Sequence, residues 1–238
     1  MTSTRGGGPM GRPRLNREGR SLKSNLLLVK LPTEERWVQF RDVFEVDRRP
    51  IHDRDQRLYK LFVEAKPGAQ QQAEELQKES SRYNLGPVMR TINIPMMALL
   101  IFDRNIHAGV VYNFADTGNI KRFEDLAPAD SIAVVEFKET TDDTLIKGEK
   151  NRAVPAHGRA WIDRTDGRVL QTELIAQDTA IRAQITVTYQ QQQGLPVLVP
   201  EEMRETYTLR QNDTRIDGCA RYGRFRQFTV TTTEKPKQ

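Results

Sequence analysis

The last third of the chain consists of segments in which apolar and polar residues alternate, and this pattern constrains the fold most strongly. In segment 182–190, Ala183, Ile185, Val187 and Tyr189 are separated by polar residues. Alternation over this length predicts a strand with one buried face and one wet face. The same pattern predicts strands at residues 158–163, 169–178, 199–210 and 215–231. Because these strands follow one another through short polar turns, we expect an antiparallel sheet.

The first part of the chain predicts a hairpin and then helices. Two strands are expected at residues 25–31 and 37–47, joined by a Pro-containing turn. Helical patterns follow at 53–64 and 69–83, and the continuously apolar segment 95–102 predicts a third helix that is buried on most sides. Further strands are expected at residues 107–114, 119–123 and 131–139.

These elements together predict an α+β fold in which helices and antiparallel strands are segregated along the chain. A meander of about eight long, twisted strands tends to curl. We therefore expect a curved antiparallel sheet, an unclosed half-barrel, with helices covering its concave face. A single domain is expected over residues 22–231, between a basic leader at 1–21 and a tail at 232–238.

The positive charge of the chain is concentrated in its first residues. The 238 residues carry a formal charge of +5, and segment 1–23 holds six basic residues and one acidic residue. The rest of the chain is therefore neutral, and we expect no nucleic-acid partner; a functional basic arm is the alternative for the leader. No apolar run is long enough to span a membrane, and no signal-peptide segment is visible.

The residue types that perform catalysis or bind metals form no known motif in this chain. His52, His107 and His157 fall in three separate segments, and Cys219 is the only cysteine. A metal site needs three or four converging ligands, and a disulfide needs two cysteines. Since no nucleophile, phosphate-loop or dinucleotide motif is present either, we expect a protein that is not an enzyme and needs no cofactor.

The strand segments resemble a known family. The residues that carry the resemblance are 158–163 (GRAWID), 166–174 (DGRVLQTEL), 185–189 (ITVTY), 198–205 (LVPEEMRE) and 222–228 (YGRFRQF). Their strand pattern and turn spacing resemble uncharacterised bacterial secreted proteins of the outer-membrane lipoprotein-sorting (LolA-like) half-β-barrel type, over about residues 22–231. The resemblance implies an open barrel with helices on its concave side and a periplasmic or secreted location. It also implies an apolar cavity, in which well-studied members of the family hold lipoprotein acyl chains.

The apolar helix and the strands that face it supply the candidate ligand contacts. They are Met96, Met97, Leu99, Leu100, Phe102, Phe137 and Met203. Methionine adapts well to irregular apolar ligands, so we expect a non-enzymatic extracytoplasmic protein that binds a lipid, an acyl chain or another apolar ligand. The alternative is that the helix fills the half-barrel, and the protein is an envelope scaffold or protein-interaction module without a small ligand. That alternative predicts an exposed apolar patch or an open sheet edge.

Overall fold

The computed structural model describes residues 19–30, 37–52, 78–79, 81–83, 94–103, 109–116, 123–148 and 152–226. The chain divides into two compact units, residues 1–80 and residues 81–238, and each unit has its own main sheet. The expected limits of one domain, at residues 22 and 231, stay a prediction.

The first unit contains the expected hairpin. Its three-stranded sheet has the order β1-β2-β3. The strands are β1 (Leu22–Lys30), β2 (Trp37–Val46) and β3 (Arg49–Pro50). Strands β1 and β2 are antiparallel along their whole length, which confirms the predicted pair of strands. The helix expected at 53–64 lies outside the described residues.

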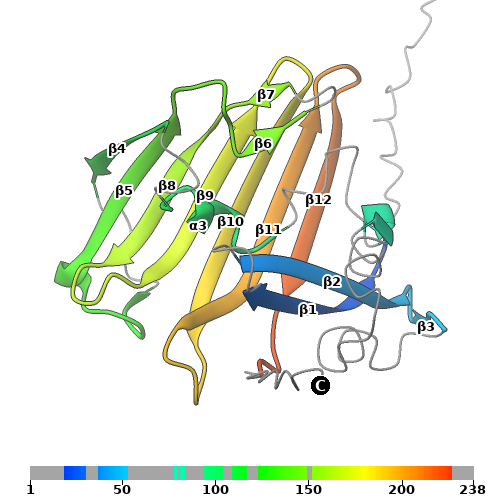
Figure 1. Ribbon diagram of the computed structural model, residues 1–238, viewed down its shortest axis with the longest axis horizontal. Helices are drawn as coiled ribbons and strands as arrows, with labels where there is room; N and C mark the ends of the chain where they lie inside the picture. The colour runs from blue at the N-terminus through cyan, green and yellow to red at the C-terminus, as the bar shows by residue number, and fades with distance from the viewer. Residues whose placement is uncertain are drawn as a thin grey trace, which may run out of the picture. The chain divides into compact units, whose positions relative to one another are not determined.

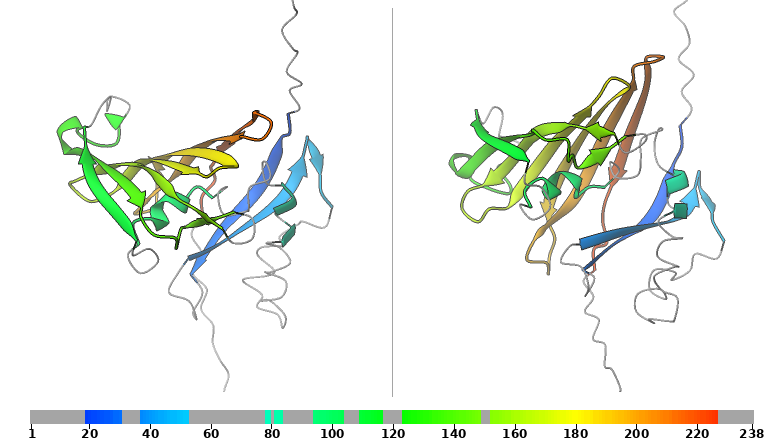
Figure 2. Two further views of the ribbon diagram at one scale, coloured as in Figure 1. Left: turned by 90° about the horizontal axis from the view of Figure 1, so that it is seen from above. Right: turned by 45° about the horizontal axis from the view of Figure 1, so that its top comes forward.

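The second unit is built on a seven-stranded antiparallel sheet with the order β12-β11-β10-β9-β8-β5-β4 (Figure 1). Its strands are β4 (Val110–Ala115), β5 (Ile132–Glu139), β8 (Ala156–Asp163), β9 (Val169–Gln177), β10 (Ile181–Gln191), β11 (Leu198–Leu209) and β12 (Thr214–Arg221). The sheet curves but does not close, and β4 and β12 are its two outer strands (Figures 1 and 2). The expected antiparallel, unclosed sheet is therefore confirmed.

The alternating segments form the strands that their pattern predicts, with one exception at the end. Strands β8 to β11 match the predicted ranges to within about two residues. The fifth predicted strand, 215–231, is too long, because β12 ends at Arg221 and residues 222–226 are not in a strand. The strand expected at 119–123 is not formed at Phe123, which begins a turn; its other residues lie outside the described part.

The expected α+β class, with several helices over the concave face, is wrong. Within the described residues the second unit is mostly β, with one four-residue α-helix, α3 (Met97–Leu100), and the short 3-10 turns η1 (Ser81–Tyr83) and η3 (Ala129–Ser131). The predicted helix at 95–102 is shorter because its backbone makes three-residue turns, with the N–H groups of Leu99 and Phe102 donating to carbonyls three residues earlier. Met96 also provides no side-chain cap at the start of α3.

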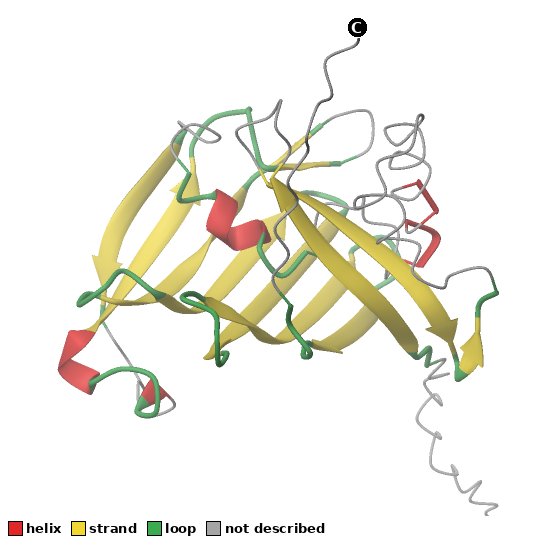
Figure 3. Ribbon diagram, turned by 60° about the horizontal axis from the view of Figure 1, so that its bottom comes forward, coloured by secondary structure: helices red, strands yellow, loops and turns green. Residues whose placement is uncertain are grey.

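Two very short strands complete the cover of the inner face, which is the side toward which the sheet curves. Strands β6 (Ile146–Lys147) and β7 (Ala153–Val154) pair with each other on the same side of the sheet as α3 (Figures 1 and 3). The sequence pattern predicts no strand at either position. Ile146 and Val154 are buried against the sheet and help to hold this hairpin in place.

The inner face carries the main core of the unit. Cross-strand neighbours Phe137, Gly158, Leu174 and Ile185 form one of its rows. A Cβ atom at Gly158 would lie 1.9 Å from the carbonyl oxygen of Glu173 and 2.7 Å from the Phe137 ring. Glycine is therefore required here, because it lets the two strands approach and leaves room for the aromatic ring.

The outer face has a second, smaller core beneath a turn. Val134 and Trp161 are cross-strand neighbours on this face, and Phe123 and Ala127 cover them. The remaining outer face is polar, as the alternation predicts. An example is the ion pair between Arg159 and Glu173, with a nitrogen–oxygen distance of 3.0 Å.

Candidate functional site

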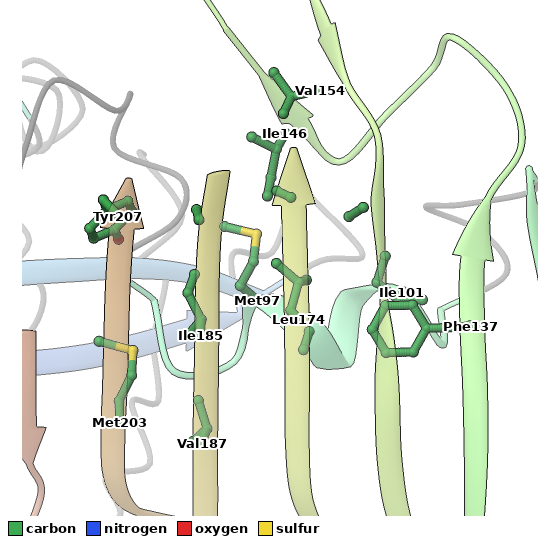
Figure 4. Packing of buried hydrophobic residues seen from close by; sticks show 14 of the residues in the cluster. Met97, Ile101, Phe137, Ile146, Val154, Leu174, Ile185, Val187, Met203 and Tyr207 are labelled. Atoms are coloured by element: carbon green, nitrogen blue, oxygen red, sulfur yellow. The ribbon is translucent and has the colours of Figure 1, made fainter. Parts of the chain in front are cut away.

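Six of the seven predicted ligand-contact residues meet in one apolar cluster on the inner face. Figure 4 shows Met97, Phe137 and Met203 among them. Met97, Phe137 and Met203 are buried, and each is at most 3% exposed. The side chains that pack half-buried against them are Met96, Leu99 and Phe102. Leu100 is also half-buried, but it does not belong to the cluster. These six residues thus belong to one apolar layer, and their role as ligand contacts stays a prediction.

Two tyrosine hydroxyls hold the α3 segment against the sheet. Tyr189 of β10 donates to the carbonyl of Pro95 at 3.0 Å, and Tyr112 of β4 donates to the carbonyl of Ile101 at 2.5 Å. Burial raises the pKa of Tyr189 far above its usual value, so its hydroxyl keeps its proton. Since the two carbonyls lie before and after α3, the helix is attached at both ends.

Aromatic contacts add to this attachment at the β4 side. The Phe102 ring stacks on Tyr112 and meets Phe137 edge-on, with ring centroids 5.7 Å apart in both pairs. Figure 4 shows Met97 and Ile101 of the α3 segment among the side chains of the sheet. In this part of the described chain, side chains fill the middle of the inner face.

Two buried carboxylates on this side of the sheet have structural partners. Glu139 accepts hydrogen bonds from the backbone N–H groups of Leu145 and Ala156, both at 2.6 Å, and so fixes the segment that carries β6 and β7. Glu205 accepts a hydrogen bond from the Tyr207 hydroxyl. Burial and the neighbouring Glu205 charge raise the pKa of Tyr207. These contacts account for acidic residues in a largely apolar layer.

The described residues offer no site for a metal. No group of three or more His, Cys, Asp or Glu side chains among them converges closely enough. His52 and His157 are exposed and belong to different units, whereas His107 lies outside the described residues. A separate finding concerns membranes: in the described part of the chain, no helix is both long and apolar enough to cross one.

The exposed apolar side chains gather on the outer strand β4. Phe114 is 83% exposed, Val111 49% and Tyr112 39%. The six residues of β4 include no charged side chain and no proline. Since natural proteins usually protect outer strands with charges, prolines or bulges, this strand has the features of a surface that pairs with another chain. The sequence predicts a strand here, but it gives no signal that the strand lies at an edge.

An open pocket of about 500 Å³ adjoins the Ala115 end of β4. Its apolar lining includes Phe114 and Ala115 of β4 and Ala133 of β5, and its polar lining comes from Asp130 and Arg164. The Arg164 guanidinium donates to the carbonyl of Asp130 at 2.5 Å, and its backbone N–H donates to Ser131 at 2.9 Å. These bonds fix the position of the polar wall of the pocket.

The opposite outer strand, β12, is protected by charge. Arg215, Asp217 and Arg221 are exposed at alternate positions of this strand. Arg221 pairs with Glu202 of β11 at 3.2 Å, and hydrogen bonds from Arg204 and Arg221 lower the pKa of Glu202. A partner strand added at β12 would therefore meet charged side chains that already have partners.

Comparison with known proteins finds no family model, no curated protein and no solved structure that matches this chain. The resemblance to lipoprotein-sorting half-barrels, with its implied location and ligand, therefore stays a prediction.

Proposed function

We propose that this protein is a non-enzymatic interaction module whose β4 edge binds an extended polypeptide segment by strand addition. The observation that carries the proposal is the composition of β4, an outer strand with no charged residue and with Phe114 83% exposed. Strand addition takes its affinity from backbone hydrogen bonds, and its specificity comes from pockets for alternate side chains. Both are offered at this edge, where the pocket lies beside Phe114 and Ala115.

The support beneath β4 suits it to such a role. Tyr112 is anchored to Ile101 through its hydroxyl and to Phe102 through its ring. A strand held in its final conformation loses little conformational freedom when a partner docks, which favours binding. The module would therefore present a rigid edge, and the ordering cost would fall on the bound segment.

Site-specific photo-crosslinking in cells that express the protein tests this function. A photoreactive residue replaces Asn113 on β4, and a matched variant carries it in place of Asp217 on β12; both positions are exposed. We expect covalent adducts from position 113 only, with mass spectrometry mapping the adduct to one segment of a polypeptide. Equal yields from the two positions, or no adduct at position 113, would contradict the proposal.

A second candidate is the binding of a lipid or acyl chain on the inner face, as the resemblance implies. The observation that favours it is the meeting of six predicted contact residues under a helix of only four residues. A ligand could take the place of α3, whose attachment includes the Tyr189 hydroxyl bond to Pro95. Native mass spectrometry of gently purified protein should then show a copurifying amphiphile, with more in Tyr189→Phe. An unliganded mass in both proteins would dismiss this candidate.

A further inference from the structure

We infer that the segment that pairs with β4 is β4 of a second copy of this chain, so that the two sheets join across a two-fold axis at Asn113. This inference rests on the proposed function, because it names the occupant of the same edge. A symmetric dimer uses the same surface on both copies, so the surface has to be complementary to itself. The side chains of β4 allow this condition to be checked position by position.

Antiparallel pairing about a two-fold axis places residues opposite each other on the same face of the joined sheet. If Asn113 lies on the axis, it faces Asn113 of the second copy. Tyr112 then faces Phe114 of the second copy, and Val111 faces its Ala115. Aromatic side chains thus meet aromatic ones, aliphatic side chains meet aliphatic ones, and the two amides can hydrogen-bond to each other.

Neighbouring registers match less well. With the axis at Tyr112, the half-exposed Val111 faces the amide of Asn113. With the axis at Phe114, the exposed carboxylate of Asp116 faces Tyr112 in the middle of the edge, whereas with the axis at Asn113 it faces Val110, the first residue of the strand. Shifting one β4 strand by a single residue would put side chains of the inner face opposite side chains of the outer face. Residues directly opposite each other in an antiparallel pair lie on the same face, so this register is excluded. The side chains therefore select the register centred on Asn113.

The pocket supports the same register. Phe114 and Ala115 line it, and these are the two residues that face Tyr112 and Val111 of the second copy. Val111 of each copy would therefore lie beside Ala115 at the pocket of the other, while Tyr112 and Phe114 pair on the opposite face of the sheet. No charged residues of β4 would be opposed, because the strand has none.

Single cysteines on β4 test the axis directly. In a Cys219→Ser background, Asn113→Cys places the thiols of two copies opposite each other, at the Cα separation of about 4.5–5.5 Å that antiparallel pairs show and disulfides can bridge. We expect mild oxidation to link most of the Asn113→Cys protein into dimers. Val111→Cys and Phe114→Cys, two controls at exposed positions of the same strand, should give at least about five times less dimer, since each faces a residue that is not cysteine. The double variant Val111→Cys/Ala115→Cys should crosslink again.

Sedimentation velocity over a concentration series tests the association without crosslinking. Wild-type protein should form dimers as concentration rises, and Asn113→Asp should raise the dimer Kd at least about tenfold, because like charges placed directly opposite in a sheet repel. An unchanged melting temperature of the dilute protein shows that Asn113→Asp still folds.

Three outcomes overturn the inference: a wild-type monomer at every concentration, equal crosslinking at positions 111, 113 and 114, or an unchanged Kd in Asn113→Asp. If the photo-crosslink from position 113 then maps to a different protein, self-pairing fails but strand addition at β4 stands. If neither a dimer nor an adduct forms, the proposed function fails as well.

Discussion

The two outer strands of the seven-stranded sheet differ in how far they are protected against pairing with another chain. Both end the hydrogen-bonded ladder, and both are similar in length. β12 carries exposed charges at Arg215, Asp217 and Arg221, whereas β4 exposes Val111 and Phe114 and carries no charge. Outer strands that are left apolar are a hazard unless something pairs with them. The difference is that charged side chains protect β12 against pairing and that β4 has no such protection.

The support behind the two strands differs as well. Phe137 lies opposite Tyr112 on the neighbouring strand and meets the Phe102 ring of the α3 segment. The inward positions of β12 include Ile216 and Ala220, which lie opposite the buried Tyr207 and Met203 of β11. The β4 edge thus has an aromatic residue of its own on the core, Tyr112, whereas β12 has none and carries ion pairs on its exposed face.

Removing the aromatic support should have the largest effect. Phe137→Ala leaves a cavity where the ring is 2% exposed, and we expect the free energy of unfolding to fall by about 3–5 kcal/mol. Hydrogen exchange should rise more at β4 than at β12, because the lost ring supports β4. Chemical denaturation and amide exchange by mass spectrometry measure the two effects. Glu136→Ala, on the exposed face of the same strand, is the control, and a loss below about 1 kcal/mol in Phe137→Ala would refute the role of the ring.

Much of the sheet could be predicted from sequence because the alternation of apolar and polar residues is a local pattern. Burial alternates along nearly the whole of β10 and over shorter stretches of β8, β9 and β11, as the geometry of a strand requires. In β11, period two puts Met203, Glu205 and Tyr207 on one face, and all three are buried. The same period would bury Glu201, but it is exposed, because a bulge opposite Thr188 and Tyr189 shifts the register there.

The features that matter for function depend on long-range order, which no local pattern reveals. The apolar residues of segment 107–114 predict a strand, but only the order of strands places β4 at an edge and exposes Phe114. The hairpin of β6 and β7 has two residues per strand, too few to show a period. The ligand contacts were predicted as a group because Met97 and its neighbours are apolar. Whether such residues line a cavity or fill a core is decided by how many side chains converge on them.

Introducing a charge on β4, like those that β12 carries, should have the next largest effect. Phe114→Lys puts a charge on the most exposed apolar residue of the edge, and a charge there opposes strand pairing. We expect association through β4, measured by sedimentation velocity, to weaken at least about tenfold, while the free energy of unfolding changes by less than about 0.5 kcal/mol. Val197→Lys, at an exposed apolar residue in the turn between β10 and β11, is the matched control. Equal weakening by both substitutions would mean that general charge, not the edge, controls association.

Removing the exposed charges of β12 should have a smaller effect on association. A triple variant, Arg215→Val, Asp217→Val and Arg221→Val, makes β12 resemble β4 in its exposed face. We expect weak new self-association that Asn113→Asp does not suppress, because it occurs at the other edge of the sheet. Light scattering at several concentrations measures it, with the single variant Asp217→Val as a milder control. If the triple variant is as monomeric as an Asn113→Asp protein, charge is not what protects β12.

Acid should weaken β12 slightly and spare β4. Hydrogen bonds from Arg204 and Arg221 lower the pKa of Glu202 below its usual value of about 4.3. A carboxylate whose pKa is lowered by folding stabilises the folded state above its unfolded pKa, and the contribution is lost as pH falls through the lower folded pKa. Between pH 7 and pH 3, amide protection corrected for intrinsic exchange should therefore decline locally in β12. Glu202→Gln should show the lower β12 protection already at pH 7 and lose less on acidification. No local decline in wild-type β12, or the same decline in Glu202→Gln, would show that the ion pair with Arg221 does not secure this edge.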